Sequence, residues 1–230
     1  GTFFSLYAQD VHPCHTDEKT AEFVSSLSPQ EKAQYEQDKL QYEQVIQNYI
    51  SAHPELMTNS GARAVQYTIP VVFHIIHAGG PENILNEQVE DCIRIMNEDY
   101  QKLNSDWNNV ESEFLSIVAD AEIEFKLAKR DPQGNCTNGI TRTYSTVTYD
   151  GDGGDRVSAV QSVHGNWPGD EYMNVFVAEN IGGAAGYTYT PSNWTVAGMS
   201  NGIHVLHNYV GSIGTSSFGT SRTMTHEAGH

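Results

Sequence analysis

The sequence predicts a mixed α/β fold in which a helix backs a sheet, and three consecutive segments support this. Residues 69–77 form a short, almost continuous apolar run, typical of a central strand that is buried on both faces. Residues 86–103 place apolar side chains along one face of a helix. Residues 121–129 alternate between apolar and polar side chains, as expected of a half-buried strand. A strand, a helix and a strand in this order build a sheet with a backing helix.

The second half of the chain extends this pattern. Residues 173–178 and 202–210 are apolar enough to form two further strands, and a short helix is expected at the end of the chain. Before and between these strands, residues 145–172 and 179–201 are rich in Gly, Asp, Ser and Asn. We predict that these two stretches are mostly long loops.

Composition narrows the range of functions. The 230 residues include 12 Lys+Arg and 29 Asp+Glu, and the formal net charge is −17. A phosphate backbone or an anionic lipid surface attracts a basic patch, so we expect neither nucleic-acid binding nor docking on acidic membranes. No apolar run reaches the roughly 18 residues that a membrane span needs, and we expect no such span. Hydrophobic residues make up 38%, which is enough for a packed core.

The first 62 residues differ from those that follow. Residues 1–8 are apolar, uncharged and end in Ala8, so we expect them to be the remnant of an export signal and the protein to be secreted. Residues 28–31, Ser-Pro-Gln-Glu, predict the start of a helix with a capping box. Residues 9–62 therefore form a separate helical region, which a polar linker joins to the domain.

The residues with the clearest chemistry are the last five, His-Glu-Ala-Gly-His at 226–230. Residues four apart lie on the same face of a helix, so the imidazoles of His226 and His230 can converge on one zinc ion. A catalytic zinc takes three protein ligands and a water molecule. Glu227 is then placed to act as general base on that water, which attacks the peptide carbonyl that the metal polarises. The motif predicts a metallopeptidase, and it leaves the third ligand to be identified.

Over several segments the chain resembles the pappalysin family of metzincin metallopeptidases, and most of all its secreted bacterial members. The stretch IEFKLAKRDPQGNCTNGITRT is far more specific for this family than the zinc motif, and the expected backing helix contains a second matching stretch, NEDYQKLN. The segments that support the resemblance are residues 69–77, 85–106, 123–143, 173–191 and 202–230.

The resemblance implies a zincin-like upper subdomain over residues 63–230, with a mixed, twisted five-stranded sheet, a backing helix and an active-site helix. A helical pro-segment at residues 9–62 would precede it. The family's zinc motif is H-E-x-x-H-x-x-G-x-x-H, of which only His226, Glu227 and His230 are present. We expect the third histidine, a methionine turn and the C-terminal subdomain to follow residue 230. The 230-residue chain by itself is then expected to be inactive.

The resemblance also implies latency, with the pro-segment as an intramolecular inhibitor that blocks access by protein or peptide substrates. A metzincin pro-segment often places one residue on the zinc in place of water, and Cys14 is the candidate because a thiolate is a strong zinc ligand. A carboxylate plug, Asp10 or Asp17, is the alternative. Pappalysins of this group tend to cleave before arginine, so we expect autolytic activation between Ala62 and Arg63, whereas a trypsin-like cut after Arg63 is the alternative.

Residues 184–189 are expected to form the upper edge of the cleft. There Ala185, Gly186, Tyr187 and Thr188 would pair with an extended substrate through main-chain hydrogen bonds, unless the segment is an ordinary hairpin.

Two further patterns concern cation binding and the core. Asp150, Asp152 and Asp155 form an oxygen-rich loop that could hold calcium, although the spacing is not that of an EF-hand and a solvated turn is the simpler interpretation. His74 lies within a predicted strand, and we expect it to be a hydrogen-bonded core histidine rather than a metal ligand.

Two alternatives to this hypothesis stay open. The chain could be a zincin of another class, in which a glutamate from a downstream helix is the third ligand. It could also be a non-catalytic binding or inhibitory fragment. The residues that follow His230 in the natural protein would distinguish these hypotheses.

Overall fold

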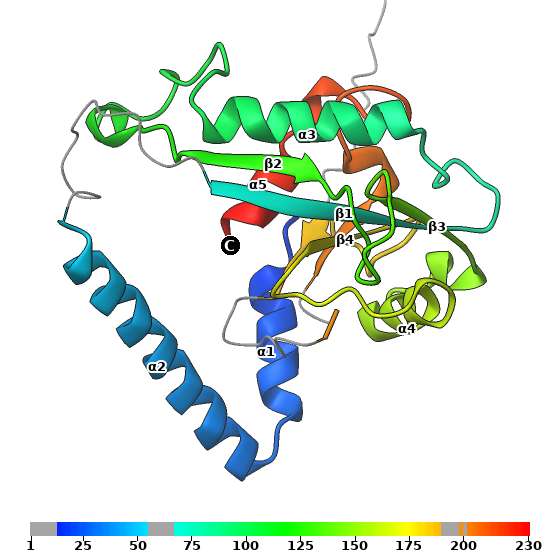
Figure 1. Ribbon diagram of the computed structural model, residues 1–230, viewed down its shortest axis with the longest axis horizontal. Helices are drawn as coiled ribbons and strands as arrows, with labels where there is room; N and C mark the ends of the chain where they lie inside the picture. The colour runs from blue at the N-terminus through cyan, green and yellow to red at the C-terminus, as the bar shows by residue number, and fades with distance from the viewer. Residues whose placement is uncertain (1–12, 55–66, 190–197, 200–201) are drawn as a thin grey trace, which may run out of the picture.

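A mostly parallel sheet forms the centre of the protein in a computed structural model, which describes residues 13–54, 67–189, 198–199 and 202–230 (Figure 1). The strands follow one another in space as β2-β1-β4-β6-β5, and β3 also pairs with β1. Only β5 pairs in the antiparallel sense. The strands are β1 (Tyr67–His77), β2 (Ile123–Leu127), β3 (Ile140–Tyr144), β4 (Met173–Ala178), β5 (Gly186–Tyr187) and β6 (Ile203–Leu206).

The six strands fill five positions across the sheet. β2 pairs with residues 67–71 of β1 and β3 with residues 73–77, so these two strands follow one another along the same edge. β4 pairs with residues 71–75 along the other edge of β1. The predicted mixed five-stranded sheet is therefore confirmed.

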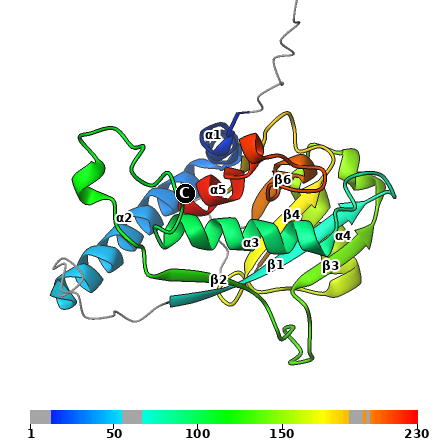
Figure 2. The ribbon, with the colours of Figure 1, turned by 90° about the horizontal axis from the view of Figure 1, so that it is seen from above.

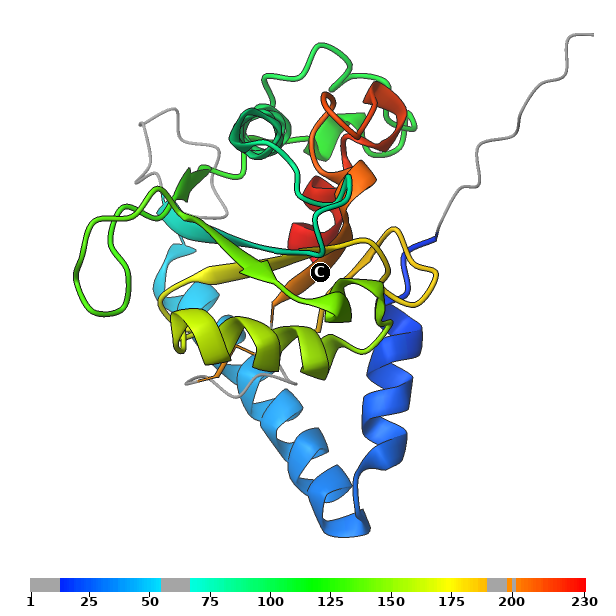
Figure 3. The same cartoon turned by 90° about the vertical axis from the view of Figure 1, so that its right-hand side faces the viewer.

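Helices cover both faces of the sheet. α3 (Asn86–Tyr100) and α5 (Thr223–Gly229) lie on one face, and α4 (Gly153–His164) lies on the other (Figure 3). The larger apolar cluster fills the space beneath α3 and α5, and it includes Val89, Met96 and Met224. A smaller cluster beneath α4 includes Val157 and Val160. The predicted central strand and backing helix are confirmed, although α3 ends at Tyr100 rather than at residue 103.

The prediction of loops over residues 145–172 is wrong for its centre, which forms α4. The helix begins where Asp152 Oδ1 accepts from the backbone N–H of Gly154 at 2.7 Å, and it ends at Gly165, whose φ is 74°. Glycine and aspartate pointed to a loop, but here they are the cap residues of a helix whose buried face is supplied by the sheet. β6 is also shorter than predicted, because a 3₁₀ turn follows at His207–Tyr209.

The N-terminal region consists of α1 (Thr16–Ser26) and α2 (Pro29–Ala52). The predicted capping box is confirmed: the Ser28 hydroxyl accepts from the Glu31 N–H at 3.4 Å, and the Glu31 carboxylate accepts from the Ser28 N–H at 2.8 Å. α1 contacts β5, lies beside α5 and leads away from the sheet, whereas α2 runs back towards the start of β1 and buries none of its residues (Figures 1 and 2). None of the described helices is both long and apolar enough to cross a membrane.

Candidate metal centre

The helix with the zinc motif is fixed to the backing helix by polar contacts and one core side chain. Met224 is fully buried in the larger apolar cluster. The Thr225 hydroxyl donates to Asp99 Oδ2 at 2.8 Å. Arg222 makes a bidentate pair with Asp106, at 2.6 and 2.7 Å, and contacts Asp99 at 3.2 Å. The Arg222 guanidinium holds the pKa of Asp106 well below its usual range. These contacts orient α5 against the sheet.

The two motif histidines converge, and a cysteine sulfur from the N-terminal region lies beside them as a third potential ligand. His226 Nε2 and His230 Nε2 lie 3.1 Å apart. Cys14 Sγ lies 3.5 Å from His230 Nε2. The potential ligand atoms of these three residues all lie within 4.8 Å of one another, and no other group of three such side chains was found among the described residues.

These spacings fit a zinc ion. Bond lengths of about 2.05 Å to nitrogen and about 2.3 Å to sulfur, at tetrahedral angles, place two nitrogens about 3.3 Å apart and a nitrogen and a sulfur about 3.6 Å apart. The nitrogens of His226 and His230 are 3.1 Å apart and Cys14 Sγ is 3.5 Å from His230, in agreement with these values, and Cys14 Sγ lies within 4.8 Å of His226. Two imidazoles and a thiolate are also the ligand types that zinc prefers. The residues present therefore suit a zinc ion, with a fourth position left for a further ligand.

Glu227 lies next to this group, and the N-terminal region covers it. Its side chain is only 1% exposed, and its Oε2 accepts from the Thr16 hydroxyl at 3.3 Å and lies 3.8 Å from Cys14 Sγ. Its Oε1 is buried and makes no hydrogen bond in the structure. Burial raises the pKa of Glu227, and the adjacent His226 opposes this effect. Gly186 allows the approach, since a Cβ atom there would stand 2.8 Å from Glu227 Cγ.

The residues around Cys14 form a short parallel pairing with the edge strand β5. Cys14 bridges to Gly186, the Ala185 N–H donates to the Pro13 carbonyl at 3.0 Å, and the His15 N–H donates to the Gly186 carbonyl at 3.4 Å. The Thr16 hydroxyl also accepts from the backbone N–H of Thr188 at 3.1 Å. Residues 185–188, predicted to pair with an extended peptide, thus pair with the chain's own N-terminal region.

Sequence reasoning named Cys14 as a candidate ligand, and the structure places it beside the histidines, but the same reasoning did not name Thr16. The alternative carboxylate plugs do not join the group: Asp17 is exposed at the start of α1, and Asp10 lies outside the described residues. Thr16 is 2% exposed and bridges Thr188 to Glu227, a pairing across more than 170 residues that no local pattern indicates. The predicted processing residues Ala62 and Arg63, and residues 1–8, also lie outside the described residues.

A cavity of about 390 Å³ opens beside the C-terminal half of α5. Glu227, Ala228 and His230 form one wall, and the first residues of β1 and β4 form another. The space lies directly against the metal centre, where an extended ligand or a further part of the protein could sit.

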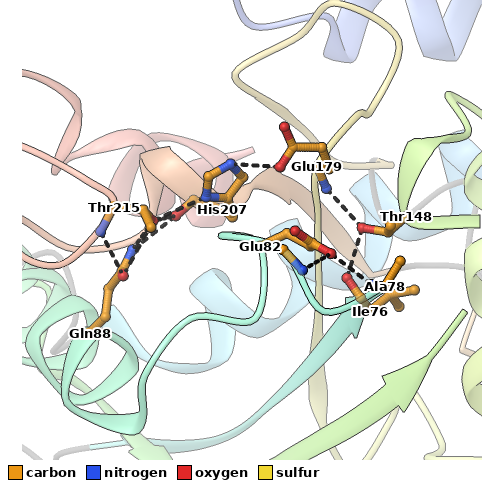
Figure 4. A network of polar contacts seen from close by, with 9 residues as sticks. Ile76, Ala78, Glu82, Gln88, Thr148, Glu179, His207 and Thr215 are labelled. Carbon is orange, nitrogen blue, oxygen red and sulfur yellow. Dashed lines mark hydrogen bonds and ion pairs between the residues drawn. The ribbon is translucent and has the colours of Figure 1, made fainter. Parts of the chain in front are cut away.

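The remaining polar candidates have structural contacts of their own. His74 is the core histidine that was predicted: it is fully buried between the Thr141 hydroxyl at 2.8 Å and Asn174 Oδ1 at 3.0 Å. His207 lies apart from the metal centre, where its Nε2 pairs with Glu179 at 3.0 Å and its Nδ1 with Thr215 at 3.1 Å (Figure 4).

The predicted calcium loop shows no converging carboxylates. Asp150 and Asp152 each accept a backbone N–H two residues on, at 3.0 and 2.7 Å, and Asp155 lies in the first turn of α4. No group of three metal-binding side chains forms there among the described residues. Calcium binding by this loop stays a prediction.

Comparisons with known proteins support the assignment of the fold. No protein-family model and no curated protein matches the chain. Promirolysin from Tannerella forsythia, solved as a glutamate-to-alanine mutant, is 29% identical, with a TM-score of 0.71 over 95% of this chain and 67% of its own. Mature mirolysin from the same organism, in complex with a cleaved peptide, is 33% identical, with a TM-score of 0.65 over 73% of this chain and 63% of its own. Mirolysin in complex with compound 9 is 34% identical, with the same TM-score and the same coverage.

The chain spans 63% of the length of both mirolysin chains, in the complex with compound 9 and in the complex with a cleaved peptide, which is less than two thirds. The match to promirolysin extends over the N-terminal region as well, because it covers 95% of this chain. The expected resemblance is therefore confirmed, and the chain has the fold of the pappalysin-family metzincins mirolysin and promirolysin, to which it is 29–34% identical.

Proposed function

We propose that this chain is the pro-segment and N-terminal catalytic part of a secreted, zinc-dependent endopeptidase in its latent form. The observation that supports this most strongly is the convergence of Cys14, His226 and His230, whose ligand atoms lie within 4.8 Å of one another. The likeness to promirolysin, and to mature mirolysin in complex with a cleaved peptide, supports peptide hydrolysis as the reaction. A histidine beyond residue 230 is proposed as the third permanent ligand.

In this proposal each side chain has a distinct task. Zinc, when bound, polarises the scissile carbonyl and lowers the pKa of a water molecule beside it. His226 and His230 hold the metal through Nε2 atoms on one face of α5. Glu227 takes the proton of the attacking water and delivers it to the leaving amine, and its Oε1 makes no hydrogen bond in the structure that would compete with this role. The main chain of residues 185–188 aligns the substrate peptide as an added strand.

The same contacts explain latency. Cys14 would supply a fourth zinc ligand, and the Thr16 hydroxyl hydrogen-bonds to Oε2 of Glu227. The pairing with β5 covers the strand edge on which a substrate would lie. We propose that cleavage between Ala62 and Arg63 releases this segment, and that the enzyme prefers arginine after the scissile bond.

The test is Glu227→Gln in the natural protein that contains this chain. Loss of the general base should lower peptide hydrolysis by about 10²–10⁴-fold while zinc content is retained. Glu98→Gln is the matched control, because the Glu98 side chain is 41% exposed on α3, away from the metal centre, and pairs with Arg94 at 2.7 Å. Hydrolysis at the wild-type rate in Glu227→Gln, or an equal loss in both variants, would contradict the proposed role.

A further inference from the structure

A buried arginine stands behind the edge strand β5, and the zinc chemistry makes no use of it. Arg156, in the first turn of α4, is 0% exposed. The acceptors that the structure gives it are all uncharged: the Tyr187 hydroxyl at 2.7 Å, His204 Nδ1 at 3.2 Å, and the carbonyls of Asp150, Gly151 (3.5 Å) and Asn180 (3.1 Å). A buried guanidinium is costly unless its donors are satisfied, so this set of acceptors is what allows it to stay there.

Arg156 determines which ring nitrogen of its neighbour His204 carries the proton. Because Arg156 Nε donates to His204 Nδ1, that nitrogen must accept, and the proton of a neutral imidazole then lies on Nε2. His204 is 0% exposed, and burial together with the arginine charge lowers its pKa well below the ordinary value. A neutral ring of defined orientation is thus available for stacking.

His204 belongs to a row of stacked rings that crosses the sheet and ends on β5. His74, Phe176, His204 and Tyr187 are successive register partners on β1, β4, β6 and β5. Their ring centroids are 5.1, 4.9 and 4.8 Å apart, with interplanar angles of 28°, 16° and 16°. At the end of this row, the Arg156 guanidinium donates to the Tyr187 hydroxyl. The position of this last ring is therefore set by the core on one side and by the guanidinium on the other.

β5 is short, so the position of Tyr187 sets the position of the strand. The strand has two residues, whose side-chain directions are opposite. Tyr187 faces Arg156, and Gly186 faces Glu227. The backbone between them pairs with Pro13, Cys14 and His15. A shift of Tyr187 would therefore move Gly186, which contacts Glu227. It would also move the backbone edge that holds Cys14 beside the histidines.

We propose that Arg156, acting through Tyr187 and His204, is a positioning residue that holds β5 where its free edge binds the pro-segment and, after activation, the substrate peptide. The substrate part rests on the proposed function, whereas the pro-segment part rests on the pairing described above. Among the described residues, the hydrogen bonds of Arg156 go to Tyr187, His204 and three backbone carbonyls, and none goes to Cys14, His226 or His230.

The test measures how often the pro-segment leaves β5, without zinc and without catalysis. The 230-residue chain in a chelator is labelled with a maleimide for increasing times, and peptide mass spectrometry gives a separate rate for each cysteine. Cys14 is partly exposed in the closed state, so local opening at β5 is measured as the rise of its rate above that of the unmodified chain; Cys92 is 0% exposed in the core and reports global unfolding, and Cys136 is exposed and reports reagent reactivity.

The main variant is Tyr187→Phe, which removes the hydroxyl but keeps the ring that stacks on His204. We expect the Cys14 rate to rise roughly three- to ten-fold, the effect of about one hydrogen bond, with the Cys92 and Cys136 rates unchanged. Arg156→Met should raise the Cys14 rate further. Arg156→Lys should not restore it, because an ammonium cannot reproduce the planar fork. Tyr144→Phe is the matched control, since it makes the same change on β3, at the opposite edge of the sheet.

An unchanged Cys14 rate in Tyr187→Phe would overturn the proposal, and so would equal rises for Cys14 and Cys92, which would indicate general destabilisation. In the activated natural protein, Tyr187→Phe should raise KM for a peptide several-fold with kcat nearly unchanged, and a fall in kcat alone would overturn the substrate part. Because the labelling needs no peptidase activity, it succeeds or fails independently of the proposed function.

Discussion

The contact between Gly186 and Glu227 gives a prediction that does not depend on zinc. A Cβ atom added to Gly186 would stand 2.8 Å from Glu227 Cγ and 2.9 Å from Glu227 Oε1. The side chain is buried, and the nearest atom, Cγ, lies close to the backbone, so rotation of the carboxylate alone does not relieve the clash. Gly186 is not among the glycines with positive φ, so alanine there strains no backbone. Any effect of Gly186→Ala should therefore act through Glu227.

The expected size follows from the cost of overpacking a buried site, about 1–3 kcal/mol. Replacing glycine with alanine also lowers the conformational entropy of the unfolded chain, which stabilises the folded state by about 0.4–1 kcal/mol. A net loss of about 1–2 kcal/mol corresponds to a fall in Tm of roughly 2–8 °C for a domain of this size. Gly219→Ala is the matched control, because its added Cβ would meet only the Ser217 hydroxyl, at 3.9 Å.

A double-mutant cycle isolates the contact. Glu227→Ala removes the atoms that the new methyl group meets, so Gly186→Ala should then cost little or nothing. The assay is thermal unfolding of the four proteins followed by circular dichroism, and the predicted coupling is at least about 1 kcal/mol. Equal effects of Gly186→Ala with and without Glu227, or no effect in either background, would refute the contact.

Two further predictions concern titration and processing. Burial lowers the pKa of His74 to about 4, below its unfolded value of 6.5, so the stability that depends on its neutral form is complete above pH 6.5 and is lost as pH falls towards 4. The loss is on the order of 3 kcal/mol, and His74→Gln should flatten the stability profile between these pH values in chemical denaturation; an unchanged slope would contradict the buried, neutral histidine. Arg63→Ala in the natural protein should prevent cleavage after Ala62, as N-terminal sequencing of the mature form would reveal, whereas continued cleavage at that bond would exclude a requirement for arginine.

Local sequence patterns predicted those helices and strands whose formation depends on neighbouring residues in the chain. The apolar run at β1, the helical face of α3 and the capping box of α2 all correspond to observed structure. The motif histidines lie four residues apart, so a single turn of helix suffices to bring them together. Cys14 was predicted from the resemblance, which implies that a pro-segment residue lies on the zinc, and from the strength of a thiolate as a zinc ligand.

Features that depend on distant partners could not be predicted. α4 was mistaken for a loop, because its buried face packs on β1 and β3 and its Arg156 finds partners on β5 and β6, none of which local composition reveals. Thr16 showed no signal, because its partners Thr188 and Glu227 are more than 170 residues away. The stacked row across the sheet likewise exists only once the strand register is set.

The most direct test of the central claim is the zinc K-edge X-ray absorption spectrum of the zinc-loaded 230-residue chain. The claim is that Cys14, His226 and His230 bind one metal ion together. It predicts one sulfur at ~2.3 Å and imidazole nitrogens at ~2.0–2.1 Å, with the sulfur shell lost in Cys14→Ser. A spectrum without sulfur in the unmodified chain, or one in which Cys14→Ser retains it, would contradict the claim.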